Sequence, residues 1–248
     1  ITDGDDAITT ISLPFDFSFF GQTFSTISVC SNGFIVPGYS TWTGSSTAGH
    51  ERHIPSFGEA TAGIIAPFWD DMHATTRYGY GDIYQYYDSS NHRYIIQWDE
   101  VAHYSNRTQR ETFQAILCDQ DYYESVTNDG DIIFQYQTVI NATSNAVGIE
   151  SPTEMDGLEY VYHNAYASHA QPLTHNRAIL LTTNPPRNNS AWLVTTNVFI
   201  TDDAGGNGNS EAEGGERIKL YVSLKNEGMD IASNVNATLS CDESSVSM

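Results

Sequence analysis

The sequence contains few basic side chains. Its 248 residues include 10 lysines and arginines against 31 aspartates and glutamates, which gives a formal net charge of -21. A surface this negative repels phosphate backbones and anionic lipid headgroups. We therefore expect no nucleic-acid partner, and divalent cations are the natural counter-ions.

Long apolar runs are also missing. No stretch approaches the roughly 18 consecutive apolar residues of a membrane-spanning helix, so we expect no membrane insertion in this segment. The opening stretch, ITDGDDAITT, does not have the pattern of a signal peptide. We interpret the chain as a mature or trimmed segment.

Cysteine is scarce, with three widely separated residues, Cys30, Cys118 and Cys241. No C-x-x-C motif or cysteine–histidine metal spacing occurs. Cys30 and Cys118 both lie in apolar, strand-like runs, which fits either two small buried thiols or one disulfide between them.

The sequence motifs of common enzyme classes are absent. There is no G-x-S-x-G, no H-E-x-x-H, no P-loop and no Rossmann glycine fingerprint, and the eight histidines are scattered. One alternative is a pairing of Asp70 with Glu100, because glycosidases use two carboxylates. The expectation is a protein that is not an enzyme.

No stretch combines a 3.6-residue apolar period with helix caps. Short runs rich in aromatic and β-branched residues recur instead, bounded by turn residues. Residues 7–21 indicate a strand followed by an aromatic-rich turn, and hairpin turns are predicted at Asn32-Gly33, at Asp88–His92 and at Asn128–Gly130. The pattern predicts an all-β protein with a jelly-roll-like antiparallel β-sandwich.

The composition changes near residue 184, where NPPRNNS is rich in proline and polar residues. We predict a sandwich domain over 1–184, a linker over 185–190 and a second domain over 191–248. The second domain shows about three strands, over residues 191–200, 217–226 and 233–241, whereas an Ig-like sandwich has about seven. Its remaining strands either lie beyond Met248 or are donated by a neighbouring chain to an exposed sheet edge.

Six segments of the first domain follow one another in order: PFDFSFFGQTFSTISVCSNGFIV, IIAPFWDDM, GDIYQYYD, RYIIQWDEV, TFQAILCD and DIIFQYQTV. Over roughly residues 8–181 this series resembles the nidogen-like extracellular module and similar modules of bacterial surface proteins. Its most specific pieces are PFWD at Pro67–Asp70 and TFQAIL at Thr112–Leu117.

In the second domain, ITDDAGGNGNSEAEGGERIKLYVSLKNEG is similar to the start of bacterial Ig-like repeats, which predicts an incomplete Ig-like β-sandwich. Together the resemblances imply an extracellular, non-catalytic module of a stalk, adhesin or fibre. Its expected partners are copies of itself or neighbouring surface proteins.

The stretch from Asp202 to Glu216 contains five acidic residues and five glycines. Ca²⁺ takes six to eight oxygen ligands in flexible geometry, and glycines permit the positive-φ turns that bring oxygens inward. We predict a calcium site with ligands from Asp202, Asp203, Asn207, Asn209, Glu211 and Glu216. The spacing departs from the EF-hand pattern, and the alternative is a solvated acidic loop.

Two further acidic runs are ambiguous. Asp70 and Asp71 follow Trp69 and either cap a turn or hold a cation. The run Asp3–Asp6 is a speculative second ion site, or a contribution to a neighbour's site.

Strand alternation places Tyr84 and Tyr86 on one face and Ile83, Gln85 and Tyr87 on the other. Exposed tyrosines stack on sugar rings, so Tyr84 and Tyr86 are candidate glycan-stacking residues, with cross-strand aromatic packing as the alternative. The alternative functions are therefore a carbohydrate-binding module or an accessory domain of a secreted hydrolase. Candidate glycosylation sequons begin at Asn106, Asn141, Asn188 and Asn236.

Overall fold

The computed structural model describes residues 1, 3–44, 51–56, 63–185, 191, 193–202, 207–209, 211, 213–226, 228 and 230–237. The chain divides into two compact units, residues 1–183 and 184–248. Within the described ranges it forms sixteen strands and one short 3₁₀ helix, η1 (Thr76–Tyr78). The all-β prediction is confirmed. No helix in these ranges has the length and hydropathy of a membrane span.

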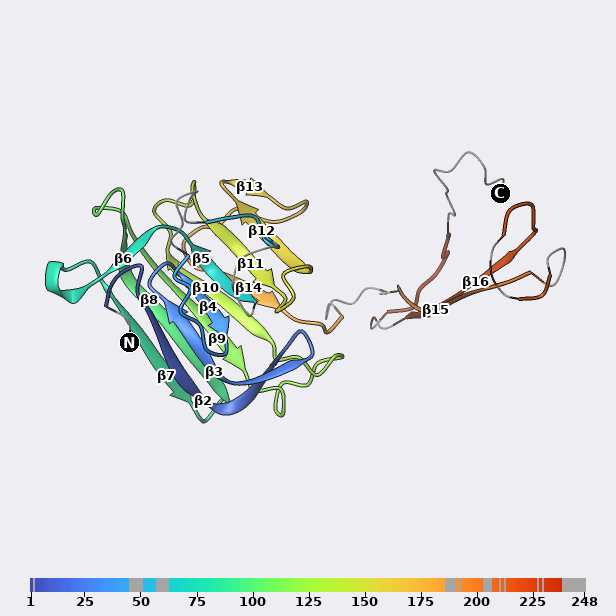
Figure 1. Cartoon of the computed structure of the whole chain (residues 1–248), viewed down its shortest axis with the longest axis horizontal. Coiled ribbons are helices and arrows are strands. Elements are labelled where there is room, and N and C mark those ends of the chain that lie inside the picture. The colour runs from blue at the N-terminus through green and yellow to red at the C-terminus, as the bar shows by residue number, and fades with distance from the viewer. Residues whose placement is uncertain are drawn as a thin grey trace. The chain divides into compact units, whose positions relative to one another are not determined.

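The first unit contains two antiparallel sheets (Figure 1). Sheet A has the order β1-β6-β8-β9-β10-β14. Strand β7 also pairs with β8: it pairs with the first part of β8, whereas β6 pairs with the last part. Its strands are β1 (Gly4–Asp5), β6 (Met72–Ala74), β7 (Asp82–Asp88), β8 (Arg93–His103), β9 (Arg110–Cys118), β10 (Ile132–Thr138) and β14 (Arg177–Leu181).

Sheet B has the order β13-β12-β11-β5-β4-β3-β2. Its strands are β2 (Ile8–Phe19), β3 (Gln22–Cys30), β4 (Phe34–Pro37), β5 (Ile64–Trp69), β11 (Ala146–Glu150), β12 (Gly157–Tyr162) and β13 (Ala165–Tyr166). The aromatic stretch at the end of β2 was expected to be a turn. It is strand instead, because Phe17 and Phe19 are buried in the core, and only Phe20-Gly21 makes the turn.

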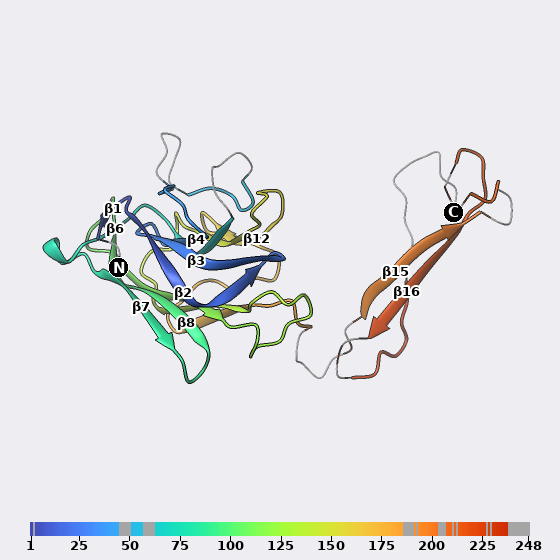
Figure 2. The same cartoon turned by 60° about the horizontal axis from the view of Figure 1, so that its bottom comes forward.

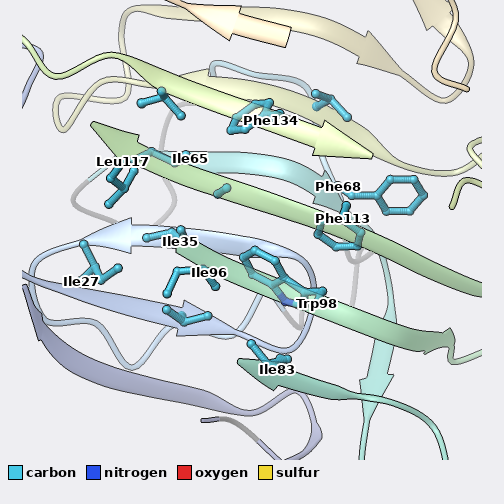
Figure 3. Packing of buried hydrophobic residues seen from close by; sticks show 14 of the residues in the cluster. Ile27, Ile35, Ile65, Phe68, Ile83, Ile96, Trp98, Phe113, Leu117 and Phe134 are labelled. Carbon is cyan, nitrogen blue, oxygen red and sulfur yellow. The ribbon is translucent and has the colours of Figure 1, made fainter. Parts of the chain in front are cut away.

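The main core lies between the two sheets. Apolar side chains at alternate positions of β8, β9 and β10 pack against those of sheet B, as period-two strands require. Figure 3 shows Ile27, Ile35 and Ile65 of sheet B near Ile96 and Trp98 of sheet A. The Trp98 indole donates a 3.0 Å hydrogen bond to the Cys30 carbonyl and so links the sheets.

A second, smaller core covers the opposite face of sheet B. Phe34, Trp42 and Trp69 form an aromatic group with ring centroids 5.0 to 5.6 Å apart. Strands β4 and β5 are therefore buried on both faces, which explains their continuous apolar sequences.

Cys30 and Cys118 are both buried free thiols. The prediction of two small buried thiols is confirmed, and the disulfide alternative is wrong. They lie on different sheets, Cys30 in β3 of sheet B and Cys118 in β9 of sheet A. Burial raises the pKa of the Cys30 thiol to about 12 and that of Cys118 to about 11. Cys241 lies outside the described residues.

The predicted Asn32-Gly33 hairpin is confirmed by the pairing of β3 with β4. Gly33 has φ of 79°, and a Cβ there would lie 1.9 Å from the Phe68 carbonyl oxygen. Only glycine fits this turn, since both the backbone conformation and the approach of β5 exclude a side chain. The hairpin around Asp88–His92 is likewise confirmed by the β7–β8 pairing. Strands β9 and β10 also pair as predicted, although residues 119–131 connect them rather than a tight turn.

The second unit contains one two-stranded antiparallel ribbon, β15 (Leu193–Thr201) and β16 (Lys219–Asn226), visible in Figure 2. Phe199 and Tyr221 stack on one face with ring centroids 4.7 Å apart. The other face carries Val198, Leu220, Val222 and Leu224, each 41 to 56% exposed. Residues 233–237 of the predicted third strand are not strand, and the rest of that segment lies outside the described residues.

Candidate functional site

The acidic glycine loop connects β15 to β16 and folds around Asp202. This side chain is fully buried, and its Oδ2 accepts hydrogen bonds from the backbone N–H groups of Gly208 (2.8 Å) and Asn209 (3.2 Å). Gly208 has φ of 82°, the positive-φ turn expected of a loop glycine. Asp202 therefore holds the start of the loop against its middle.

Asn207 connects the middle of the loop to its last residues. Its backbone N–H donates to Glu216 Oε1 (3.1 Å), and its side-chain amide donates to Glu213 Oε2 (2.6 Å). The Asn207 and Asn209 side-chain oxygens accept from the N–H groups of Asn209 and Glu211, at 3.0 and 2.8 Å. The described predicted ligands thus belong to one hydrogen-bonded loop, and Asp203 lies outside the described residues.

A second group of acids lies at one end of the sandwich. Asp5, Asp6 and Asp71 place their carboxylate oxygens within 4.8 Å of one another. The pairing of β1 with β6, which sets Asp5 opposite His73, brings these distant segments together. Asp6 also accepts a 2.8 Å hydrogen bond from the buried Asn32 side chain. The two ambiguous acidic runs of the sequence therefore meet at one place.

Asp70, the sequence neighbour of Asp71, is one of two carboxylates that hold a buried histidine. His103 is 2% exposed, and its Nδ1 lies 3.3 Å from Asp70 Oδ2 while its Nε2 lies 2.8 Å from Glu111 Oε1. Burial by itself lowers the pKa of His103, but the hydrogen bonds and charges of Asp70 and Glu111 outweigh that effect and raise it to about 9. The imidazole is therefore a cation at neutral pH.

The remaining contacts of this group tie the chain together. Glu111 accepts hydrogen bonds from the N–H groups of Ile140 (2.7 Å) and Asn141 (2.8 Å). Asp70 accepts from the Asp71 N–H and from the Ser144 hydroxyl, both at 2.8 Å. These contacts join β5, β8, β9 and the loop after β10. All three ionisable side chains are at most 4% exposed, so they contact one another and the neighbouring backbone rather than solvent.

Sequence reasoning missed both His103 and Glu111 and considered Glu100 as the partner of Asp70. Glu100 is exposed at a bulge of β8 with φ of 51°, and the carboxylate that shares a partner with Asp70 is that of Glu111. The alternation of side chains along β9 was the sequence signal that could have identified Glu111. Glu111 stands two residues before the inward-facing Phe113 on β9, and a carboxylate at such a position needs a buried partner.

The tyrosine strand is arranged as predicted. Ile83 is fully buried, whereas Tyr84 and Tyr86 are 51 and 64% exposed on the opposite face. Within the described part of the chain neither ring contacts another aromatic ring, while Tyr87 packs at 6.2 Å from Phe15. The aromatic-packing alternative therefore applies to Tyr87 and not to the two exposed tyrosines.

The four sequons differ in accessibility. Asn106 lies exposed between β8 and β9, whereas Asn141 is partly buried and its amide donates to Gln109. Asn236 is exposed, although its Thr238 lies outside the described residues, as does the whole of the Asn188 sequon. Asn106 is thus the most accessible of the described acceptors whose sequon is complete.

A comparison with protein-family models matches residues 1–193 to the family described as NIDO related. The match spans the whole sandwich unit. Neither the curated proteins nor the solved structures yielded a significant match.

Proposed function

Because the chain belongs to the NIDO-related family, we propose that it is a non-catalytic extracellular module of a cell-surface stalk, adhesin or fibre. The family match over residues 1–193 is the observation that carries this proposal. The closed histidine–carboxylate group supports it, because the most enzyme-like constellation of the described residues serves to join strands.

Self-association through the second unit is part of the proposal. A two-stranded ribbon is marginal on its own in water, and its apolar face needs a further layer or further strands. The face formed by Val198, Leu220, Val222 and Leu224 supplies such a surface. We infer that it packs against a second copy of the chain, through strand pairing or end-to-end contact.

Calcium is the proposed stabiliser of the loop between the two ribbon strands. The expected ligands are those predicted from the sequence: Asp202, Asp203, Asn207, Asn209, Glu211 and Glu216. Their clustering in one short connection between β15 and β16 supports the proposal, because a divalent cation would offset the repulsion among the carboxylates. A stiffened connection would favour an ordered, rod-like assembly.

Light scattering of the purified protein tests both parts. With Ca²⁺ present we expect particles larger than one chain, and with excess chelator we expect their mass to fall. Mg²⁺ at equal concentration should restore less of the assembly, since Mg²⁺ demands tighter octahedral geometry. A monomer of unchanged mass in both conditions would contradict the proposal.

A matched pair of variants separates the loop from general charge effects. Glu216→Gln keeps the shape of a side chain that accepts hydrogen bonds from Asn207 and Glu213 but removes its charge. We expect it to require more Ca²⁺ for assembly. Glu100→Gln removes an exposed charge from the sandwich and should leave the calcium requirement unchanged.

A further inference from the structure

We propose that the outer face of sheet A binds a neutral polysaccharide chain in a depression centred on Gln114. This inference rests on the sandwich unit alone and is independent of the proposed assembly. The surface is formed by β7, β8, β9, β10 and β14, on the side that faces away from sheet B.

Strand register builds two parallel rows on this face. The first row carries Tyr84, Gln97, Gln114, Gln135 and Ala178, each paired with the next across neighbouring strands. The second row, two residues along each strand, carries Tyr86, Ile95, Ile116, Ile133 and Leu180. An amide row thus runs beside an apolar row, and each begins with an exposed tyrosine on β7.

The amide row opens into a depression of about 360 Å³. The polar side chains that line it are Gln97, Thr112, Gln114, Gln135, Gln137 and Asn176. Arg177 is the one charged residue among the described lining residues. The depression is therefore almost uncharged, although the chain carries a net charge of -21.

Most of the hydrogen-bonding capacity of these amides is unused. The Gln114 amide nitrogen donates a 2.6 Å hydrogen bond to the Gln97 side-chain oxygen, which leaves the Gln97 nitrogen and the Gln114 oxygen for a ligand. Gln135, Gln137 and Asn176 are exposed, and their side chains make no hydrogen bond within the described part of the chain.

These features select the chemistry of the ligand. A carboxamide both donates and accepts hydrogen bonds, as a sugar hydroxyl does, whereas the exposed tyrosine faces and Leu180 suit the C–H face of a sugar ring. The net negative charge disfavours an acidic polymer, and the near-neutral lining offers nothing to a basic one. Five strands at a spacing of about 4.8 Å make a strip of roughly 19 Å, long enough for several sugar units.

The test is affinity gel electrophoresis of the whole chain in gels that contain hydroxyethylcellulose, xyloglucan, galactomannan, dextran, heparin or alginate, one per gel. We expect retardation by at least one of the four neutral polymers. Tyr84→Ala and Gln135→Ala should each weaken it about tenfold, as expected for central contact residues. Both side chains are exposed, so the folded state should tolerate the changes, which the thermal unfolding midpoint checks.

Two variants away from sheet A provide matched controls, one in the segment after β4 and one in β3. Tyr39→Ala removes a tyrosine that is 75% exposed, and Gln22→Ala removes an exposed strand glutamine. Neither should change the retardation. The proposal is overturned by retardation in none of the neutral gels, by retardation only in heparin or alginate, or by an equal loss in the control variants.

Self-association through this face is the competing occupant. In that case Tyr84→Ala would lower the particle mass in light scattering and leave polysaccharide retardation absent or unchanged, which would overturn the proposal. A monomer that is retarded by a neutral polymer would support the polysaccharide site and count against the assembly proposed above.

Discussion

At the scale of single residues, the charge of the buried His103 imidazole affects the stability of the folded sandwich. Taking one imidazolium and two carboxylates out of water is costly, and the cost is offset only when each charge has its partners. Here both ring nitrogens face a carboxylate, and Glu111 receives two backbone N–H groups in addition. Loss of the cation would leave two acids buried side by side.

This arrangement predicts a loss of stability at alkaline pH. The pKa of His103 is raised from its ordinary 6.5 to about 9 in the folded protein. A raised folded-state pKa contributes stability that is complete below pH 6.5 and declines as pH rises through about 9. We expect the free energy of unfolding to fall by ~2–3 kcal/mol across this window, measured by urea denaturation at several pH values.

Two histidine variants check the assignment. His103→Gln should be strongly destabilised at pH 6.5, by about 3–5 kcal/mol, and should show a much flatter pH profile. His169→Gln removes an exposed histidine and should retain the slope of the unchanged protein. If both variants kept that slope, another group would be responsible for it.

At the scale of elements, two kinds of strand coexist in the sandwich. Strands β8, β9 and β10 alternate between the inter-sheet core and the outer face of sheet A. Strands β4 and β5 are apolar at every position because Trp42 and its neighbours cover the outer face of sheet B. Among the described residues nothing covers the apolar face of the ribbon β15–β16, which makes it the element most in need of a partner.

A charge on that face should prevent the proposed association. Val222→Lys places an ammonium in the middle of the apolar face, where it stays solvated in a single chain because Val222 is 50% exposed. In an assembly the same charge would be buried without a partner. We expect light scattering in Ca²⁺ to show a monomer. Ser223→Lys adds the same charge on the opposite face and should assemble normally; equal masses for the two variants would contradict the strand-face interface.

At the scale of the whole molecule, the sandwich core is contained in one unit. Every residue of the two buried clusters lies within residues 1–183, and so do the described parts of the acidic trio and the histidine group. The second unit contributes the ribbon and its loop. A division of this kind implies that the first unit is stable without the second.

We therefore expect a fragment of residues 1–183 to unfold cooperatively in urea, with the midpoint that the sandwich shows in the whole chain. Tryptophan fluorescence reports on it through Trp42, Trp69 and Trp98. A fragment of residues 1–175 lacks β14, the sheet A partner of β10, and should be clearly less stable. Gradual unfolding of the longer fragment would show that the core needs residues beyond 183.

Local pattern was enough for most of the strands and for the direction of many side chains. Alternation predicted that Ile83 points inward and that Tyr84 and Tyr86 point outward, because a strand has a period of two whatever it pairs with. Turn chemistry predicted the Asn32-Gly33 hairpin for a similar reason, since positive φ is a property of the residue itself. The aromatic end of β2 was misassigned because only burial shows that Phe17 and Phe19 belong to the core.

The sequence by itself thus determined the all-β class, the negative charge and the family resemblance, which depend on composition, periodicity and the order of motifs. Only the tertiary structure decided which distant side chains meet. The contact of His103 with Asp70 and Glu111, the approach of Asp5 and Asp6 to Asp71, and the glutamine row across sheet A all depend on strand order and register. A local pattern does not specify these, because a shift of one residue in register leaves each strand's own periodicity unchanged while moving every side chain to the other face.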